Sequence, residues 1–313
     1  MLMTPDLLVC PACRRLTDGR LDVRTLTRTG DVLACECGRR YPVIDGVPIL
    51  IKDPAFLRTA LVGLIERDLA PEVAALLAEP GPDDAAYPHL LEHLSVYLDA
   101  HWGDRAEPAT DFALAPVIER IAALPRVAAA VELGCSVGRV LAELPAELAI
   151  GIDITFGAIR RARHLLAGEA LAYARRIVGR HYARATINPI QRAATLICGD
   201  ALDPPLLPEL YDRVVALNVL DSIAKPRGLL AVVDGLCKPG GELILSSPYA
   251  WRSNVVHDDE RIGGADPATA VIALLRERHY KIVEETEIAW TLRQDARTTI
   301  SYRSHYIRAR KGT

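Results

Sequence analysis

Two glycines and two carboxylates are spaced along this chain in a way that can bind a nucleotide. The run Val131-Glu-Leu-Gly-Cys-Ser-Val-Gly138 places the acidic Glu132, Gly134 and Gly138 at the end of a short apolar stretch. Glycines let a backbone turn tightly and approach a ligand closely. Asp153 follows about twenty residues after Gly134, where a carboxylate can accept hydrogen bonds from two ribose hydroxyls. The spacing predicts a cradle for an adenosyl compound.

The surrounding sequence predicts the elements that position this cradle. Residues 127–133 are apolar enough for a buried parallel strand, and residues 139–148 can form the helix that follows. A second apolar run over residues 148–152 ends at Asp153. The glycines therefore fall at a turn from strand to helix, which is where dinucleotide folds hold their ligand.

From residue 127 onward, strand-like and helix-like stretches alternate, which predicts an α/β fold with a doubly wound, mostly parallel sheet. Ligands bind at the carboxyl edge of such a sheet. Three later strands also end in polar or aromatic residues that would meet at this edge. Those residues are Asp200 and Ala201 after the first, Asn218 and Asp221 after the second, and Tyr249 and Trp251 after the third.

The order of these features resembles class I S-adenosylmethionine-dependent methyltransferases over roughly residues 110–310. The shared features are the acidic-Gly-x-x-x-Gly run, Asp153, Gly-Asp200, a strand led by Tyr-Asp and a strand led by Pro-Gly-Gly. An NAD-linked dehydrogenase would share the first two but would less readily explain the others. Ser136 stands where the family often has its middle glycine. The resemblance implies S-adenosylmethionine as cofactor, bound by Glu132, Gly134, Cys135, Ser136, Gly138, Asp153, Ile154, Asp200, Ala201 and Asn218.

The second half of the chain has a narrower resemblance. Asn218-Val-Leu-Asp-Ser-Ile, Leu245-Ser-Ser-Pro-Tyr-Ala-Trp251, Gly263-Gly264 and the segment 291–306 are similar to the C-terminal methyltransferase domain of ovothiol synthase. This similarity implies N-methylation of the imidazole of a thiol-histidine or of a related small metabolite. The chain departs from the family after Trp251, where Arg-Ser-Asn-Val-Val-His-Asp-Asp is more polar and basic than the family pattern.

Such an acceptor defines roles for the residues at the strand ends. An imidazole nitrogen must present its lone pair and lose a proton, so Asp221 or a nearby histidine is a candidate base and Asn218 can orient the ring. Tyr249 and Trp251 can stack on a flat acceptor or contact a sulfonium. We therefore name Asn218, Asp221 and Tyr249 as catalytic candidates. His257 and His305 rank lower, because a lone histidine is more often a surface or hydrogen-bonded structural residue.

An aromatic segment before the nucleotide-binding region has two interpretations. Residues 91–103 concentrate Tyr97, His101 and Trp102, with His93 one turn earlier. As a lid over the site, they would contact the substrate. As an amphipathic helix, they would pack their aromatic rings on the core. Cys135 and Cys198 also lie near the cradle, but no Cys-His arrangement accompanies them, so buried packing is favoured over nucleophilic catalysis.

Four cysteines near the N-terminus have the spacing of a metal site. Cys10-Pro-Ala-Cys13 and Cys35-Glu-Cys37 are two pairs about twenty residues apart, and four thiolates can fill the tetrahedral shell of a structural zinc ion. The second pair is Cys-x-Cys where Cys-x-x-Cys is more usual, which leaves a metal-free ribbon as the alternative. Residues 7–52 resemble the small zinc-ribbon domains that accompany or activate tRNA and release-factor methyltransferases.

These features divide the chain into three regions. Residues 1–52 form a zinc-ribbon domain, residues 53–115 a helical linker and lid, and residues 116–313 the methyltransferase domain. Within the linker, Pro-Gly-Pro near position 82 predicts a loop between two helical segments.

Composition limits the partners. A net charge of −3 over 313 residues gives no general attraction to nucleic acid, and no apolar run is long enough to span a membrane. We expect a cytoplasmic protein and a small-molecule or peptide acceptor that carries an imidazole or a thiol; the oligomeric state stays open. In the alternative, the ribbon is a docking module for a peptide, a protein or tRNA. A chain that binds an adenosyl compound without turnover is a third hypothesis.

Overall fold

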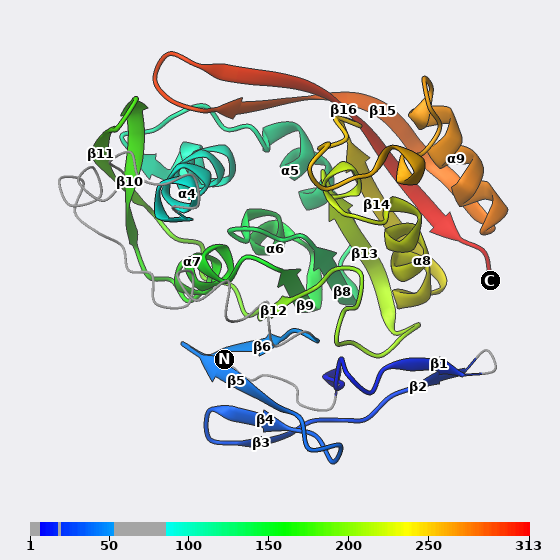
Figure 1. Cartoon of the computed structure of the whole chain (residues 1–313). Coiled ribbons are helices and arrows are strands. Elements are labelled where there is room, and N and C mark those ends of the chain that lie inside the picture. Colours follow the sequence, from blue (N-terminus) through cyan, green and yellow to red (C-terminus); the bar gives the residue numbers. More distant parts are fainter. Residues whose placement is uncertain (1–6, 18–19, 53–85) are drawn as a thin grey trace.

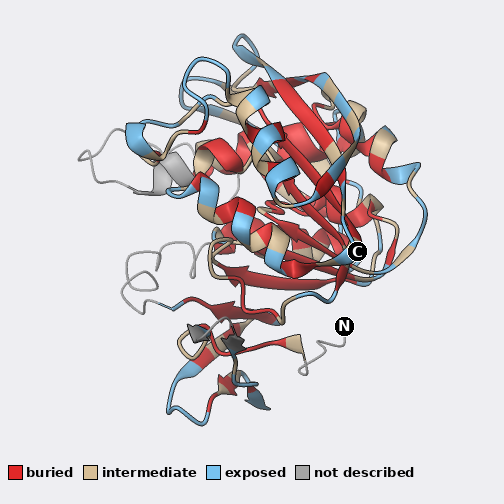
Figure 2. Cartoon of the chain, turned by 90° about the vertical axis from the view of Figure 1, so that its right-hand side faces the viewer, coloured by how far each residue is buried: buried red, intermediate tan, exposed pale blue. Residues whose placement is uncertain are grey.

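The fold is centred on one large sheet with helices on both faces (Figure 1). A computed structural model describes residues 7–17, 20–52 and 86–313 of the chain. The loop and the first helical segment expected within residues 53–85 lie outside these ranges. In Figure 2, the buried residues concentrate in the strands of the sheet and on the helix faces that cover them.

Six neighbouring strands of this sheet run parallel. In spatial order they are β14 (Cys237–Ser247), β13 (Tyr211–Leu217), β8 (Val127–Leu133), β9 (Ala146–Asp153), β12 (Thr195–Gly199) and β6 (Val47–Leu50). Their carboxyl ends therefore meet at one edge. The predicted α/β fold with a doubly wound parallel sheet is confirmed, and β8 has the expected bounds.

Antiparallel strands extend the sheet on both sides. A long hairpin, β15 (Tyr280–Arg293) and β16 (Thr299–Lys311), pairs with β14. On the other side, β5 (Arg40–Ile44), β4 (Val32–Ala34) and β3 (Thr27–Thr29) continue from β6. A small separate sheet consists of β1 (Arg15–Thr17) and β2 (Arg20–Asp22).

The helices divide between two hydrophobic cores, one on each face of the sheet. One core receives α4 (Ala86–Trp102), α5 (Ala115–Ala122), α6 (Arg139–Glu143) and α7 (Phe156–Leu166). The other receives α8 (Pro226–Leu236) and α9 (Pro267–Glu277). Short 3-10 helices are η2 (Gly103–Arg105), η3 (Leu220–Ser222) and η4 (Asp258–Glu260).

Helix α6 is shorter than the sequence predicts. The expected helix covered residues 139–148, but α6 ends at Glu143 and β9 already begins at Ala146. The cause is Pro145, since the residue before a proline is disfavoured in the helical region. Leu144 accordingly has extended backbone angles, with φ −65° and ψ 116°.

A second sheet holds α4 in place. It consists of β10 (Leu171–Val178), β11 (His181–Ile187) and β7 (Ala106–Glu107). Asp99 of α4 is buried, and its carboxylate accepts hydrogen bonds from Arg175 on β10 over 2.8 Å and from Arg293 on β15 over 2.7 Å. Because a buried carboxylate is costly without partners, these two arginines fix α4 between the second sheet and the β15–β16 hairpin.

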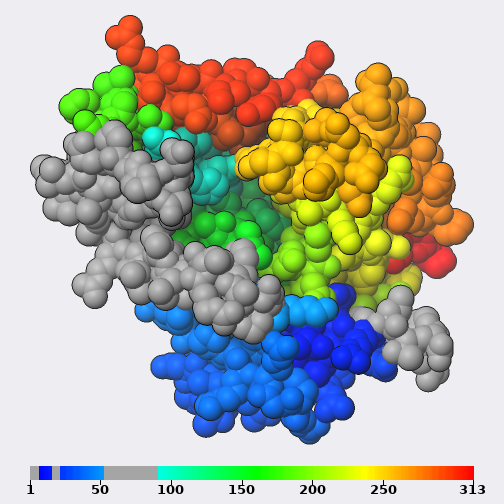
Figure 3. Space-filling view, in the orientation of Figure 1, coloured from blue at the N-terminus to red at the C-terminus, as the bar shows by residue number. Residues whose placement is uncertain are grey.

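The N-terminal residues are not set apart from the main sheet. Strand β6, which the sequence analysis includes in the ribbon domain, pairs in parallel with β12, with Ile49 opposite Cys198. Leu8 forms a bridge with Leu206, and the backbone N–H of Val9 donates to the carbonyl of Pro205 over 3.1 Å. Figure 3 shows the blue N-terminal region packed directly against the rest of the chain. This region and the β12 loop therefore share one interior.

Within the described ranges, no helix combines the length and the apolar character needed to cross a membrane.

Candidate active site

The loop between β8 and α6 has the backbone that the glycine spacing predicts. Gly134 and Gly138 have φ values of 75° and 79°. A Cβ on Gly134 would lie 2.4 Å from Cγ2 of Val219, and one on Gly138 would lie 2.8 Å from the Cβ of Ala162. Both positions therefore need glycine for two reasons, the left-handed backbone and the lack of space.

Ser136 and Asp153 join this loop to the end of β9. The backbone N–H of Ser136 donates to Oδ2 of Asp153 over 2.9 Å, and the N–H of Thr155 donates to Oδ1 over 2.8 Å. Ser136 has a φ of 48°, in the region that glycine favours, which explains why the related family often has glycine there. Burial raises the pKa of the Asp153 carboxyl. Each carboxylate oxygen can accept a further hydrogen bond, so the contact with ribose remains chemically available.

Glu132 is a buried carboxylate with an unused acceptor. Its side chain is 2% exposed, and Oε2 has no hydrogen-bond partner among the described residues. Burial and then the charge of Asp153 raise its pKa to about 8. An unpaired buried carboxyl group lacks a cationic partner, and the ammonium group of an amino acid would supply one. This observation fits the methionine part of S-adenosylmethionine.

The other predicted cofactor residues follow the ends of β8, β9 and β12. Cys135 is fully buried under the turn, whereas Ile154 is 39% exposed beyond β9. Asp200 and Ala201 are half-buried after β12. Oδ1 of Asp200 accepts the N–H of Leu202 over 2.8 Å, so part of its role is to shape the turn.

Trp102 lies beneath the loop of residues 134–138 between β8 and α6, called the cofactor loop below. Its ring is completely buried, and its Nε1 donates to the carbonyl oxygen of Val137 over 2.9 Å. The guanidinium of Arg139 stacks 5.2 Å from the Trp102 ring and is paired with Asp104 over 2.6 Å. Direct contact with a substrate needs exposed surface, which Trp102 lacks; its contacts instead hold the loop from below.

Asn218 comes directly after β13 in a constrained backbone. It has a φ of 54°, and its backbone N–H donates to the carbonyl of Ser246 over 2.8 Å. Its Oδ1 accepts the hydroxyls of Ser246 and Ser304 over 3.0 Å and 3.1 Å. The next residue, Val219, is the one that crowds Gly134. Asn218 therefore lies beside the cofactor loop with a fixed amide group.

Asp221 anchors the segment that follows β14. Its Oδ2 accepts the backbone N–H of Ala250 over 2.8 Å, and its carbonyl accepts the N–H of Arg252 over 3.1 Å. Burial raises the pKa of its carboxyl. Tyr249 and Trp251, on either side of Ala250, have φ values of 53° and 37°. Asp221 thus holds two aromatic residues in a backbone conformation that such residues rarely adopt without support from neighbouring groups.

Tyr249 takes part in a chain of side-chain contacts that the sequence analysis did not foresee. Its hydroxyl lies 2.9 Å from Nδ1 of His305, and Nε2 of His305 lies 3.2 Å from Oε1 of Glu285. As a lone histidine in the sequence, His305 is only a weak candidate for the site, and no sequence pattern points to Glu285. Only the pairing of β16 with β14, which sets Ser247 opposite His305, brings them to this edge; no local motif signals it.

The aromatic residues of α4 meet the segment after β14. Nη2 of Arg252 donates to the Tyr97 hydroxyl over 3.3 Å, and the rings of Tyr97 and His93 are 4.4 Å apart. Burial and the positive charge of Arg252 lower the pKa of His93 to about 4. His101 is buried with its Nδ1 unpaired, and burial lowers its pKa to about 3. Both imidazoles are therefore neutral near pH 7. His257 is exposed before η4.

The four N-terminal cysteines converge. The sulfur atoms of Cys10, Cys13, Cys35 and Cys37 all lie within 4.8 Å of one another. Cys10 and Cys37 are 3.9 Å apart, and Cys13 and Cys35 are 3.7 Å apart. Zinc with four thiolates at about 2.3 Å in a tetrahedron sets the sulfurs about 3.8 Å apart, so these residues fit a closed zinc site. A tight turn follows the first cysteine of each pair, including the shorter Cys-x-Cys pair.

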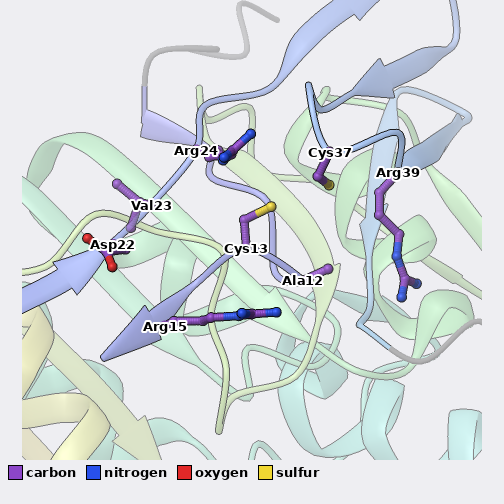
Figure 4. Close-up of a pocket in the computed structure, with 8 residues that line it drawn as sticks. All are labelled: Ala12, Cys13, Arg15, Asp22, Val23, Arg24, Cys37 and Arg39. Atoms are coloured by element: carbon purple, nitrogen blue, oxygen red, sulfur yellow. The ribbon is translucent and has the colours of Figure 1, made fainter. Parts of the chain in front are cut away.

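A surface cavity lies beside these cysteines. Its volume is about 740 Å³, and Figure 4 shows Cys13 and Cys37 with three arginines around it. The lining residues are Ala12, Cys13, Arg15, Asp22, Val23, Arg24, Cys37 and Arg39. Three guanidinium groups against one carboxylate give this cavity a positive character.

Residues 131–245 match a family model described as "Methyltransferase domain". Solved structures of similar fold include the N-methyltransferase NodS from Bradyrhizobium japonicum, which is 18% identical, with 63% of this chain and 94% of that chain covered and a TM-score of 0.44. An S-adenosylmethionine-dependent methyltransferase from Methanosarcina mazei is 17% identical, with coverage of 63% and 97% and a TM-score of 0.42. A chain in the complex that contains the Trm112 methyltransferase activator of Haloferax volcanii is 14% identical, with coverage of 72% and 96% and a TM-score of 0.45. No curated protein matches this chain significantly.

Proposed function

We propose that this chain, whose residues 131–245 match a methyltransferase-domain model, is a class I S-adenosylmethionine-dependent methyltransferase that methylates an imidazole nitrogen of a histidine derivative, such as a thiol-histidine or a related small metabolite. The observation that carries this proposal is the pair of half-buried aromatic rings that follow β14. The Tyr249 and Trp251 rings lie 5.9 Å apart and tilted by 37°, at the same sheet edge as Asn218. Flat rings near a fixed amide suit a flat heteroaromatic acceptor.

The residues around the β8 loop would hold the cofactor. Glu132 has a free carboxylate oxygen for the ammonium group, Asp153 stands at the end of β9 for the ribose, and Asp200 stands after β12 for the adenine. When bound, S-adenosylmethionine supplies a methyl group on a positively charged sulfur. The protein contributes mainly alignment of the acceptor with that group.

On the acceptor side, each residue has a separate task. Asn218 would orient the ring of the acceptor, while Tyr249 and Trp251 would stack against it. Asp221 holds these two aromatic residues through the N–H of Ala250. The Tyr97 hydroxyl accepts a hydrogen bond from Arg252 of the same segment, and Tyr97 would close one side of the acceptor site. Trp102 would act indirectly, by supporting the loop at Val137.

The test is methyl transfer from labelled S-adenosylmethionine by the purified full chain. The acceptor panel contains thiol-histidines, histidine, histidine-containing peptides and tRNA. We expect the label on an imidazole nitrogen of a small histidine derivative, located by mass spectrometry and NMR. Label found only on peptide or tRNA would contradict the small-molecule proposal, and binding without transfer to any acceptor would contradict enzymatic activity.

A second candidate function is favoured by the arginine-lined cavity. In this alternative the four-cysteine module docks an anionic peptide, protein or tRNA whose methylation the chain performs or assists. Arg15, Arg24 and Arg39 supply the positive charge. Replacing all three by alanine should then reduce methylation of the macromolecule at least tenfold and leave small acceptors unaffected. Arg28→Ala, an exposed change in the same module, is the matched control. Equal loss with small acceptors would reject docking.

A further inference from the structure

Three side chains from three separate segments form a continuous hydrogen-bonded chain at the acceptor side. The Tyr249 hydroxyl lies 2.9 Å from Nδ1 of His305, whose Nε2 lies 3.2 Å from Oε1 of Glu285. Tyr249 follows β14, His305 belongs to β16 and Glu285 belongs to β15. The His305 side chain is 4% exposed, whereas that of Glu285 is 48% exposed. The hydrogen-bonded chain thus runs from Tyr249 through a buried imidazole to the surface.

The chemistry of the three groups determines which group donates and which accepts in each of these hydrogen bonds. An ionised carboxylate only accepts hydrogen bonds, so Nε2 of His305 carries the proton that faces Glu285. A neutral imidazole then has an unprotonated Nδ1, and the Tyr249 hydroxyl must donate to it. The lone pairs of the Tyr249 oxygen are left for another donor.

Carboxylates surround His305. Besides Glu285, β15 contributes Glu287, which lies opposite His305 in the strand register. The N-cap residue of α9, Asp266, interacts electrostatically with His305, and Asp221 and both glutamates act on the neighbouring Tyr249. Glu285 can pair with the imidazolium that forms when Nδ1 of His305 accepts a proton.

We propose that Tyr249, His305 and Glu285 form a proton relay that removes the proton which the acceptor imidazole loses on methylation. The relay rests on the proposed function for its substrate. The unprotonated ring nitrogen of the acceptor forms a bond to the methyl carbon, and the carbon–sulfur bond breaks with its electron pair going to sulfur. The N–H proton of the other ring nitrogen passes to the Tyr249 oxygen as the Tyr249 hydroxyl proton passes to Nδ1 of His305. The resulting imidazolium is paired with Glu285, and no further reactant is needed.

In this relay Tyr249 is the catalytic residue, since it contacts the acceptor. His305 and Glu285 act through Tyr249 and are positioning residues for the proton. Asp221 keeps its role in holding the segment after β14. The proposal therefore separates the residue that shapes the site from the residues that move the proton.

The first test measures the tautomer of His305 and needs no turnover. In the full chain with ¹⁵N-labelled histidine, His305→Gln identifies the His305 signals. We expect a proton on Nε2 and none on Nδ1, and we expect Tyr249→Phe to shift the Nδ1 signal while the His164 signals stay unchanged. His164 is the control because it forms an exposed pair with Glu169. A neutral His305 with its proton on Nδ1 would overturn the relay, because Tyr249 would then have no acceptor.

The second test is kinetic. Tyr249→Phe and His305→Gln should each lower kcat about 100-fold, the usual scale of general base catalysis, and Glu285→Gln about 10-fold. Cofactor Kd should stay near wild type. The pH dependence of kcat should differ between wild type and His305→Gln, because only the wild type has the imidazole of the relay. The variants His164→Gln and Glu169→Gln are the matched controls, and their activity should be unchanged.

A kcat for His305→Gln within twofold of wild type, or an effect on KM alone, would overturn the relay. Failure of the proposed function has a different result. In that case wild type methylates no histidine derivative, while the tautomer measurement still decides whether the hydrogen-bonded chain has the direction that the relay requires.

Discussion

Nη1 of Arg14 donates to Oδ1 of Asp203 over 3.1 Å and so ties the four-cysteine module to the loop after β12. The same loop begins with Asp200. Within it, the carbonyl oxygen of Pro205 accepts a hydrogen bond from the backbone N–H of Val9. Arg14 follows Cys13 directly. The cysteine cluster and the loop that begins with Asp200 are therefore directly connected, although they are far apart in sequence.

This connection predicts that metal loss weakens cofactor binding. We expect one zinc ion per chain by elemental analysis, lost in Cys10→Ser together with about a tenfold rise in the Kd of S-adenosylmethionine, measured by calorimetry. The physical reason is that a structural zinc site contributes folding energy to its module. Arg28→Ala should change neither value. Native protein without zinc, or zinc-free protein with unchanged cofactor Kd, would contradict the connection.

Asp153→Asn should weaken cofactor binding about 10-fold to 100-fold. The carboxylate accepts the N–H groups of Ser136 and Thr155, and hydrogen bonds to a charged acceptor contribute about 1.5–3 kcal/mol each. An asparagine amide has one oxygen for these two donors and no charge. Calorimetric titration with S-adenosylmethionine measures the change, and the exposed Asp45→Asn serves as control. Unchanged binding would refute the ribose assignment.

Glu132 predicts a pH dependence of stability in the cofactor-free protein. Its pKa is raised from 4.5 to about 8 by burial, so between these values the native state binds more protons than the unfolded state. The contribution of Glu132 to stability is therefore fully present below about pH 4.5 and is lost as the pH rises through 8. Denaturant unfolding from pH 5 to 9 should show this loss in wild type and not in Glu132→Gln; parallel pH curves would disprove it.

The same carboxyl group links cofactor binding to proton release. A cationic ammonium favours the ionised form of Glu132, so the affinity for S-adenosylmethionine should rise with pH up to about 8. Calorimetry in buffers of different ionisation enthalpy should detect release of up to one proton near pH 7. Glu132→Gln should bind weakly with no such release. A pH-independent affinity in wild type would exclude an interaction between the two groups.

Trp102→Phe should loosen the cofactor loop while keeping the ring packed. The change removes the Nε1 hydrogen bond to Val137 and leaves a buried carbonyl unpaired, which costs about 1–3 kcal/mol. We expect a melting temperature several degrees lower and a weaker affinity for cofactor, with KM for the acceptor unchanged. Trp290→Phe, also in the core beside α4, is the control for ring volume. A rise in acceptor KM alone would instead support direct substrate contact.

Local patterns were sufficient to predict the backbone around the glycine turn. The bounds of β8, the strained turn from Gly134 to Gly138 and the position of Asp153 at the end of β9 all depend on contiguous residues. The predicted end of α6 was wrong, because Pro145 disfavours a helical backbone at Leu144. Ser136 adopts a left-handed backbone, with φ 48°, although it is not a glycine.

The surroundings of Tyr249 were only partly predictable, because they depend on strands that pair across long stretches of sequence. Tyr249 and His305 are separated by 56 positions and meet only through the register of β14 and β16. Tyr97 reaches Arg252 across 155 positions, since Asp99 fixes α4 between two sheets. Periodicity and spacing carry no information on such contacts, whose cost in chain entropy is offset only by packing of the whole core.

By itself, the sequence determined the parallel α/β fold, the cofactor loop and the pairing of cysteines, because each follows from short-range backbone preferences and ligand spacing. Tertiary structure alone decided that Trp102 supports the loop from beneath, that β6 joins the main sheet beside β12, and that His305 and Glu285 stand behind Tyr249. The physical reason is the same in each case: sheet register and burial select one partner among many that are equally compatible with local sequence.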